Sequence, residues 1–438
     1  MKSLIGFLAP FKNTLTELIF DHYPYNVPLM HLLKSLPKLT HLTLHFCHGS
    51  QRRTPQQRKF QYIIEDEDAN TNSNFTSNLV YLYLEVLSNF SQAFNSVLSV
   101  SPKLRALIVP NSLDFNGECL FQCNLINTRC PSLRYLVWNL HSQDVKINHT
   151  QTLNRWKMAS TCSDYDEQVG TLREIIFNIS TELLKTILPL LQASQQQLTH
   201  VYLNRISRSG SLHIRELVQL RLPKLKRLVL KDLADWQLEW IKFVKTCEQL
   251  ENLELETSRD YELLYNIIEA IKPLEYLRDI RLRVTDGREH EIQGVNISHF
   301  LQKCPSLQSL DLSGLCVSDQ DLLKICNLRT LQVLKLDMKR YENYLSLEGL
   351  LQAADRLQAT ESGIQTLKLA RVYNLTDAVL ERLGQVKNLS TVSIEYNQQI
   401  TTNGAQAFVS GTHNGEDRSF YVYNCYGVSA SNGKFWPE

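Results

Sequence analysis

The chain has 438 residues, of which 43% are hydrophobic and 21% charged, and its 46 basic and 45 acidic residues leave a formal net charge of +1. This apolar content is too high for a disordered chain, and the charge balance gives no basic field that would attract nucleic acid or an anionic membrane. No apolar run reaches the roughly 18 residues that a membrane-spanning helix needs. We therefore expect no nucleic acid and no membrane among the partners.

One short apolar pattern recurs along the whole chain: leucine or isoleucine at a first position, then apolar residues three and five positions later. The first positions are Leu15, Leu39, Leu79, Leu104, Leu133, Leu172, Leu198, Leu225, Leu250, Leu277, Leu307, Leu331, Ile364 and Leu389. A degenerate last copy places Phe420 and Val422 three and five positions after residue 417. From residue 15 to residue 417 the chain takes fourteen steps over 402 residues, just under 29 each. This period is typical of leucine-rich repeats, with one strand and one helix in each repeat.

A repeat of this length cannot bury its apolar side alone, so neighbouring copies must stack into a continuous core. The sequence thus predicts an α/β leucine-rich-repeat solenoid of about fifteen repeats, a horseshoe or arc with a parallel concave β-sheet and helices on the convex side. Because repeat proteins grow by adding units, we expect residues 1–438 to form a single leucine-rich-repeat domain.

Several segments between the strands carry helix signals. Residues 181–192 read TELLKTILPLLQ, with Ser180 placed to cap the first turn and Glu182 inside it. Ser318-Asp319 and Thr376-Asp377 repeat the same device ahead of later apolar-periodic runs. These positions predict three helix starts.

Two steps are longer than the rest and contain polar segments, residues 48–78 and 141–170. Both are predicted to be loops inserted into the solenoid, because segments this polar cannot bury a helix face. They are either loops that contact a partner or tolerated insertions, and the sequence leaves both open. The C-terminal tail from residue 428 is short and polar, so we expect it to cap the last repeat poorly.

Ten cysteines lie at irregular spacings, and Cys130, Cys247 and Cys304 occupy the same place ahead of a strand. Burial as small apolar residues explains this placement better than disulfides do. A chain of this kind is typical of a reducing compartment, and we expect a cytoplasmic or nuclear location.

Residues two, four and six positions after each first leucine should face outward from the concave sheet. The predicted partner-binding residues on this face are Tyr81, Tyr83, Tyr135, Tyr202, Arg227, Lys231, Glu254, Glu256, Arg281, Arg283, Asp311 and Lys335. Exposed tyrosines beside charged rows are common in protein-binding surfaces. Alternatively, opposite charges on adjacent strands simply solvate the sheet, at about 0.2–1 kcal/mol per pair.

The repeats resemble a known subtype at specific residues. Cys304-Pro305-Ser306-Leu307 opens a strand, Cys316 closes it and Ser318-Asp319 starts a helix, while Cys130-Pro131-Ser132-Leu133, Asn374-Leu375-Thr376-Asp377 and Gln399-Ile400-Thr401 repeat parts of this arrangement. This is similar to the cysteine-containing, RNI-like repeats of the F-box/LRR protein family. That resemblance implies the substrate-binding region of an SCF-type E3 ubiquitin ligase receptor. No F-box is encoded ahead of the repeats in this chain, so the Skp adaptor and cullin are expected as partners only if an F-box lies upstream.

No catalytic pattern is complete. His290-Glu291 starts like a zinc-protease helix, but Gly294 stands where the second histidine belongs. Cys119, Cys123 and Cys130 are close together without the paired spacing of a zinc site. We therefore expect no enzyme activity, no metal and no cofactor, and a non-catalytic module that binds a protein substrate or partner on the concave face. The alternatives are a repeat-only scaffold or regulator and, less favoured, a small-ligand receptor at the tyrosines.

Overall fold

In the computed structural model the contacts of the chain gather into two compact units, Met1–Leu222 (unit 1) and Pro223–Glu438 (unit 2). Each unit is described by itself. The described residues are 2–21, 29–45, 75–84, 96–109, 129–138, 172–178, 181–204, 216, 217, 219–231, 242–257, 264, 266, 274–285, 297–301, 303–338, 345–359, 362–410, 418–425, 428, 434 and 435.

Unit 1 is built on parallel strands that pair in chain order. Its strands are β1 (Glu17–Phe20), β2 (His41–Leu44), β3 (Tyr81–Leu84), β4 (Ala106–Val109), β5 (Tyr135–Trp138), β6 (Glu174–Asn178) and β7 (His200–Asn204). Its helices are α1 (Lys2–Leu8), the 3-10 turn η1 (Ala9–Phe11), α2 (Leu29–Ser35) and α6 (Thr181–Ser194).

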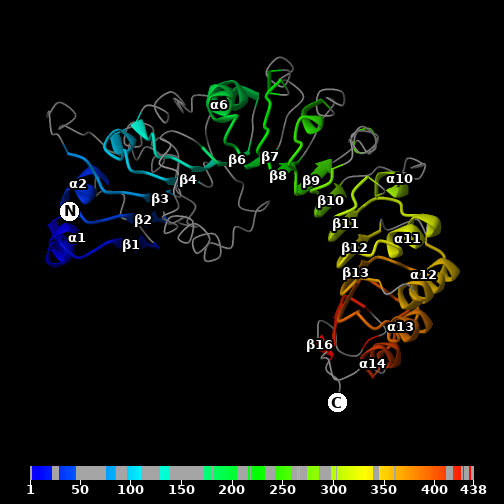
Figure 1. Ribbon diagram of the computed structural model, residues 1–438. Coiled ribbons are helices and arrows are strands. Elements are labelled where there is room, and N and C mark those ends of the chain that lie inside the picture. The colour runs from blue at the N-terminus through cyan, green and yellow to red at the C-terminus, as the bar shows by residue number, and fades with distance from the viewer. Residues whose placement is uncertain are drawn as a thin grey trace, which may run out of the picture. The chain divides into compact units, whose positions relative to one another are not determined.

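Unit 2 continues the same construction (Figure 1). Its parallel strands are β8 (Arg227–Leu230), β9 (Asn252–Thr257), β10 (Asp279–Val284), β11 (Ser309–Ser313), β12 (Val333–Asp337), β13 (Thr366–Ala370), β14 (Thr391–Glu395) and β15 (Ser419–Tyr423), followed by the short β16 (Lys434–Phe435). Its helices are α10 (Ile297–Leu301), α11 (Asp319–Cys326), α12 (Leu347–Ala359), α13 (Asp377–Leu383) and α14 (Thr402–Ser410).

The predicted repeat pattern is confirmed strand by strand. In the described part of the chain, β1 to β15 each begin two residues after a predicted first position, as β11 begins at Ser309 after Leu307. The apolar residues at the first, fourth and sixth places are buried in most described repeats, as Leu307, Leu310 and Leu312 are. In the first repeat, Leu15 and Leu18 are only partly buried. This spacing works because the residues three and five places after the first leucine fall on one face of the strand.

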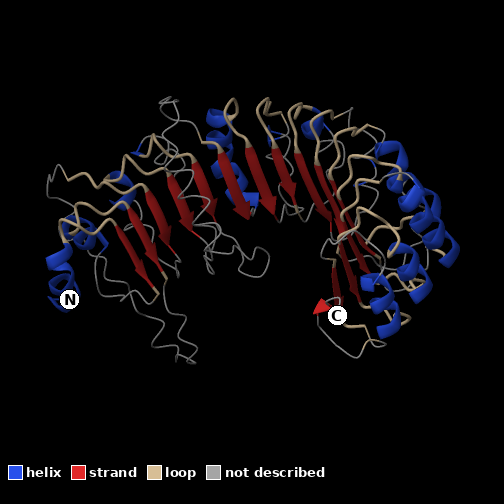
Figure 2. Cartoon of the chain, turned by 60° about the horizontal axis from the view of Figure 1, so that its bottom comes forward, coloured by secondary structure: helices blue, strands red, loops and turns tan. Residues whose placement is uncertain are grey.

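The helices of unit 2 lie along one side of its strands, and no described helix or strand covers the other face of that sheet (Figures 1 and 2). The core fills the space between strands and helices: Phe408 of α14 and Phe420 of β15 are fully buried with ring centroids 5.5 Å apart. The uncovered side is called the open face below.

The predicted helix starts are confirmed at α6, α11 and α13. At α11 the Ser318 hydroxyl caps the helix by accepting from the backbone N–H of Asp321. The matching residue at α13, Thr376, makes no such bond with its side chain, so the predicted capping is wrong in that detail.

Aspartates at two helix starts tie each helix to the next repeat. The Asp319 carboxylate accepts from the backbone N–H of Ser346 at 2.9 Å and from its hydroxyl at 2.7 Å. The same hydroxyl accepts from the backbone N–H of Gly349 at 2.9 Å. Asp377, Thr401 and Gly404 repeat this arrangement one step further along the chain. These hydrogen bonds hold the start of α12 against α11 and the start of α14 against α13.

The end of unit 2 differs from expectation. Strand β16 pairs antiparallel with β15, in the register Phe420↔Phe435 and Tyr421↔Lys434. The tail was expected to cap poorly, yet this pairing occupies the outer edge of β15, which would otherwise expose unpaired backbone groups. The predicted insertion at 141–170 lies outside the described residues, as does the insertion at 48–78 except for its last residues, 75–78.

The cysteines that the structure describes are buried and not paired in disulfides: Cys130, Cys247, Cys304, Cys316, Cys326 and Cys425. Cys130, Cys247 and Cys304 share one turn, in which the cysteine carbonyl accepts from the N–H of the first leucine. Burial raises the pKa of Cys130, Cys247 and Cys304 each to about 12. These thiols stay protonated at neutral pH, so they pack as small apolar groups rather than react. The expected burial is confirmed for these cysteines.

Candidate partner-binding face

Two tyrosines of the predicted partner-binding face, Tyr81 and Tyr83, are buried, so the expectation that they are exposed is wrong. Tyr81 and Tyr83 do lie on the predicted side of β3, but they are only 4% and 3% exposed rather than an exposed aromatic group. Their rings contact the preceding strand segment, with centroid distances of 5.9 Å from His41 to Tyr81 and 5.0 Å from His45 to Tyr83. Burial, and then the carboxylate of Glu17, raise the pKa of Tyr81 well above that of an ordinary tyrosine.

Their neighbours on the next strands explain this burial. Tyr81 and Tyr83 form an apolar cluster with Ala106, Ile108 and Val137, and Tyr135, Ile176 and Tyr202 pack against it, partly buried. These residues hold outward places on β3 to β7. The outward places of β3, β4 and β5 are therefore apolar or aromatic, whereas β6 and β7 also carry Glu174 and His200 there. Tyr135 and Tyr202 are the more accessible tyrosines of this face.

In unit 2 the corresponding face is charged, and the register alternates the signs. Arg281 of β10 lies between Glu254 of β9 and Asp311 of β11, and Asp311 lies opposite Lys335 of β12. Arg283 Nη2 lies 3.0 Å from Asp311 Oδ2, and Lys335 Nζ lies 3.4 Å from the same oxygen.

Lys231, just after β8, joins this network at its other end. Its Nζ lies 3.3 Å from Glu254 Oε1 and 3.4 Å from Glu256 Oε2, and Arg281 Nη1 lies 3.7 Å from Glu254 Oε2. The structure therefore brings together all of the predicted charged residues from Lys231 to Lys335. Cross-strand pairing, the alternative interpretation of the pattern, is present among them.

The charges are arranged in depth as well as along the sheet. The side chains of Glu254 and Asp311 are 11% and 10% exposed, whereas that of Arg281 is 46% exposed. Arg283 and Lys335 are 29% and 32% exposed, so these two basic groups and Arg281 are more accessible than the carboxylates that they pair with. Lys231 is the exception, at 13% exposed beside Glu256 at 18%.

The Asp311 carboxylate interacts with three side chains of this face, those of Arg283, Ser313 and Lys335. Burial would raise its pKa, but hydrogen bonds from Ser313 and Arg283 and the charges of Lys335 and Arg283 outweigh burial and lower the pKa below the usual value of 3.8. The Ser313 hydroxyl donates to Asp311 Oδ1 at 2.7 Å. The folded state therefore favours the ionised form of Asp311.

We expect Asp311→Asn to lower the free energy of unfolding at pH 7 by about 1–2 kcal/mol, because hydrogen bonds to charged groups are lost while the amide keeps part of the geometry. A carboxylate with a lowered folded-state pKa contributes stability that is lost as the pH falls through that pKa. The difference between wild type and variant should shrink below about pH 4 in urea titrations followed by circular dichroism. Asp355→Asn, at an exposed pair with Arg382, is the control for a solvated carboxylate. A difference that stays constant down to pH 2.5 would contradict the assignment.

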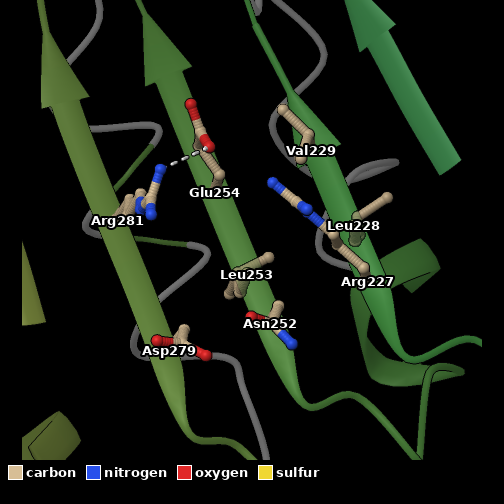
Figure 3. Close-up of a pocket in the computed structure, with 8 residues that line it drawn as sticks. All are labelled: Arg227, Leu228, Val229, Asn252, Leu253, Glu254, Asp279 and Arg281. Carbon is tan, nitrogen blue, oxygen red and sulfur yellow. Dashed lines mark ion pairs between the residues drawn. The ribbon is translucent and has the colours of Figure 1, made fainter. Parts of the chain in front are cut away.

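A shallow pocket of about 140 Å³ opens on this face across β8, β9 and β10. Its lining residues are Arg227, Leu228, Val229, Asn252, Leu253, Glu254, Asp279 and Arg281. Figure 3 shows the side chains of Arg227 and Arg281 extending from the two outer strands toward the middle strand, where Glu254 lies between them.

The pattern of repeats did not predict a second feature, at the ends of the later strands. Arg371 and Tyr396 directly follow β13 and β14 and have positive φ angles of 56° and 55°. This backbone conformation is energetically unfavourable for bulky residues. The Arg371 guanidinium lies over the Tyr396 ring, 5.6 Å from its centroid, and pairs with Asp337. The leucine spacing does not predict this contact, because it does not determine the backbone angles at the end of a strand.

Among the described residues, no group of three or more histidine, cysteine, aspartate or glutamate side chains is placed to hold a metal ion, and no helix has the length and apolar character to cross a membrane. The motif at His290-Glu291 and the cysteines Cys119 and Cys123 lie outside the described residues.

Parallel strands with buried leucines at fixed places, each adding to the sheet in chain order, define a leucine-rich-repeat solenoid. No family model and no curated protein matches the chain. Among solved structures it is similar to an internalin (inlF) from Listeria monocytogenes, with 12% identity and a TM-score of 0.42 over 97% of this chain and 89% of the internalin.

A plant peptide hormone receptor, RGFR1 in complex with RGF2, is a further similar structure, with 11% identity and a TM-score of 0.30. That match covers 78% of this chain, and the chain spans about half (50%) of the receptor. Both structures are distant from this chain in sequence.

Proposed function

We propose that this chain is a non-catalytic protein-recognition module and that its binding surface is the open face of unit 2. The observation that carries the proposal is the exposure of Arg281, Arg283 and Lys335 on that face, beside the more buried carboxylates of Glu254 and Asp311. Solenoids use such extended sheet surfaces for binding. Recessed carboxylates also hold the basic side chains in place, which lowers the entropic cost of ordering them against a partner.

We propose further that the module is the substrate-binding region of an SCF-type ubiquitin ligase receptor of the F-box/LRR family. The cysteine-containing repeat supports this, since Cys304, Cys316 and Cys326 pack as buried groups around one strand–helix unit. The Ser318-Asp319 helix start, with its bonds into the next repeat, supports it as well. In this role the module holds a protein target while a separate enzyme modifies it, in a cytoplasmic or nuclear location.

Site-specific photo-crosslinking tests the recognition face. A photoreactive amino acid replaces Lys335 or Lys368 on the open face, or the exposed Gln352 or Gln406 on the helix side. We expect one discrete protein to be crosslinked from the two open-face positions and not from the helix-side positions. Binding of the purified protein should then be weakened by reversing Arg281 and Arg283 together to glutamate. Crosslinks from the helix side alone would overturn the proposal.

The ubiquitin role is tested separately, on the full-length gene product. We expect it to co-purify with the Skp adaptor and cullin and to direct ubiquitin onto the crosslinked protein. If the partner binds the open face but the Skp adaptor is absent from the purified complex, the module is a scaffold or regulator without ubiquitin chemistry.

A further inference from the structure

We propose that the pocket between Arg227 and Arg281 receives a single carboxylate side chain of a protein partner. This inference rests on the proposed function, because it names the chemistry that the open face selects. At about 140 Å³ the pocket is well below the roughly 300–1,000 Å³ of sites for small-molecule ligands. It has room for one side chain of a bound peptide segment.

The two guanidinium groups have capacity to bind a further anion. In the described part of the chain, Arg227 makes no ion pair or hydrogen bond through its side chain. Arg281 has one ion pair, and its 3.7 Å separation from Glu254 is longer than the 2.7–2.9 Å that is typical of a charge-assisted hydrogen bond. Glu254 is itself shared with Lys231.

The geometry suits a carboxylate. Figure 3 shows the arginines reaching inward from strands on either side of β9, so that an anion above Glu254 would meet a guanidinium on each side. A planar guanidinium can hold both oxygens of a carboxylate, which gives orientation as well as attraction. Since Arg281 is nearly half exposed, a ligand can reach it without displacing its neighbours.

The acidic lining residues restrict the charge of that anion. Asp279 lines the same pocket and Glu254 lies between the arginines, so two carboxylates offset the two guanidinium charges and leave little positive charge to balance a second negative charge on a ligand. A phosphate or a polyanion is therefore disfavoured relative to a single carboxylate. The chemical class that this balance selects is an aspartate or glutamate in an otherwise uncharged peptide segment.

Peptide display on the purified full-length chain tests the assignment. We expect selected peptides to share one aspartate or glutamate position, and changing that residue to asparagine or glutamine in a synthetic peptide should weaken binding about tenfold or more. The variant R227E/R281E should lose these peptides. The matched control R278E/K245E carries the same charge change at two exposed residues outside the pocket and should keep them. Circular dichroism confirms that both variants are folded.

The outcomes separate this inference from the proposed function. Selected peptides without a shared acidic position, or with equal affinity for R227E/R281E, would overturn the pocket assignment. The same holds if phosphoserine in the acidic position binds tighter than glutamate. If such peptides still compete with the crosslinked partner, the open face remains the recognition surface. If they bind only the helix side, the proposed function fails as well.

Discussion

Replacing Arg418 with alanine should lower the free energy of unfolding of the last repeats by about 2–4 kcal/mol, because each buried carbonyl left without a donor costs about 1–3 kcal/mol and some of these carbonyls regain water. Arg418 is 4% exposed. Its guanidinium donates to the carbonyls of Gly384 at 2.6 Å, Val386 at 2.9 Å and Phe408 at 3.3 Å. These carbonyls lie near or beyond the C-terminal ends of α13 and α14, where backbone C=O groups have no N–H partner within the helix.

Two further features make Arg418 hard to replace. Its guanidinium carbon lies 5.3 Å from the centroid of the Phe408 ring, so the side chain also packs as part of the core. Burial lowers its pKa, but an arginine keeps its charge at any ordinary pH. Lysine has a single ammonium and cannot reach three acceptors in a planar fork, so Arg418→Lys should recover less than half of the lost stability.

Hydrogen exchange of the α13 and α14 amides is the measurement, supported by urea denaturation, since local opening in a repeat protein need not follow global unfolding. The control is Arg382→Ala, at an exposed ion pair with Asp355, for which the expected loss is about 1 kcal/mol or less. Equal exchange in Arg418→Ala and wild type would show that water replaces the guanidinium without loss.

Sequence predicts the strands of this protein well because one physical constraint sets them. A leucine at three fixed places must be buried between sheet and helix, and Leu277, Ile280 and Leu282 satisfy this in β10 as their counterparts do elsewhere. The pattern fixes which face of each strand turns outward, so the predicted charged residues do gather on one face of unit 2.

What the leucine pattern does not fix is the environment of the outward residues. Tyr81 and Tyr83 were expected to be exposed, but Ala106, Ile108 and Val137 at the outward places of the next two strands make that region apolar. This signal was available in the sequence, as apolar outward residues in successive repeats. The burial of Glu254 and Asp311 beside the more exposed Arg281 and Lys335 could not be predicted, since it depends on side-chain length and rotamer.

The buried contacts of Arg418 could not be predicted from the sequence, for a different reason. It stands one residue after the first position of its repeat, a place where Arg278 of an earlier repeat is exposed. Nothing in its own neighbourhood along the chain marks it, because its acceptors come from residues 10 to 34 positions earlier. Contacts of that range depend on how the repeats stack.

Gly349→Ala should destabilise the protein by about 1–3 kcal/mol, the usual cost of overpacking a filled space. A Cβ atom at Gly349 would lie 2.0 Å from Oδ1 of Asp319, the carboxylate that binds the backbone and hydroxyl of Ser346. Alanine is favoured over glycine within a helix by about 1 kcal/mol, so a loss of stability would have to come from this contact. Gly6→Ala in α1, where a Cβ meets nothing within 4 Å, is the matched control and should be neutral or slightly stabilising.

A double-mutant cycle with Asp319→Ala isolates the contact. If the carboxylate is what excludes a side chain at Gly349, the cost of Gly349→Ala should largely vanish once Asp319 is alanine, which gives a coupling of about 1 kcal/mol or more in urea denaturation. A cost that persists unchanged in the Asp319→Ala background would place its origin in the backbone instead. Gly404 and Asp377 offer an independent repetition, because a Cβ at Gly404 would lie 2.1 Å from Asp377 Oδ1. Agreement between the two sites would show that an aspartate and a glycine one repeat later act as a single device for stacking helices.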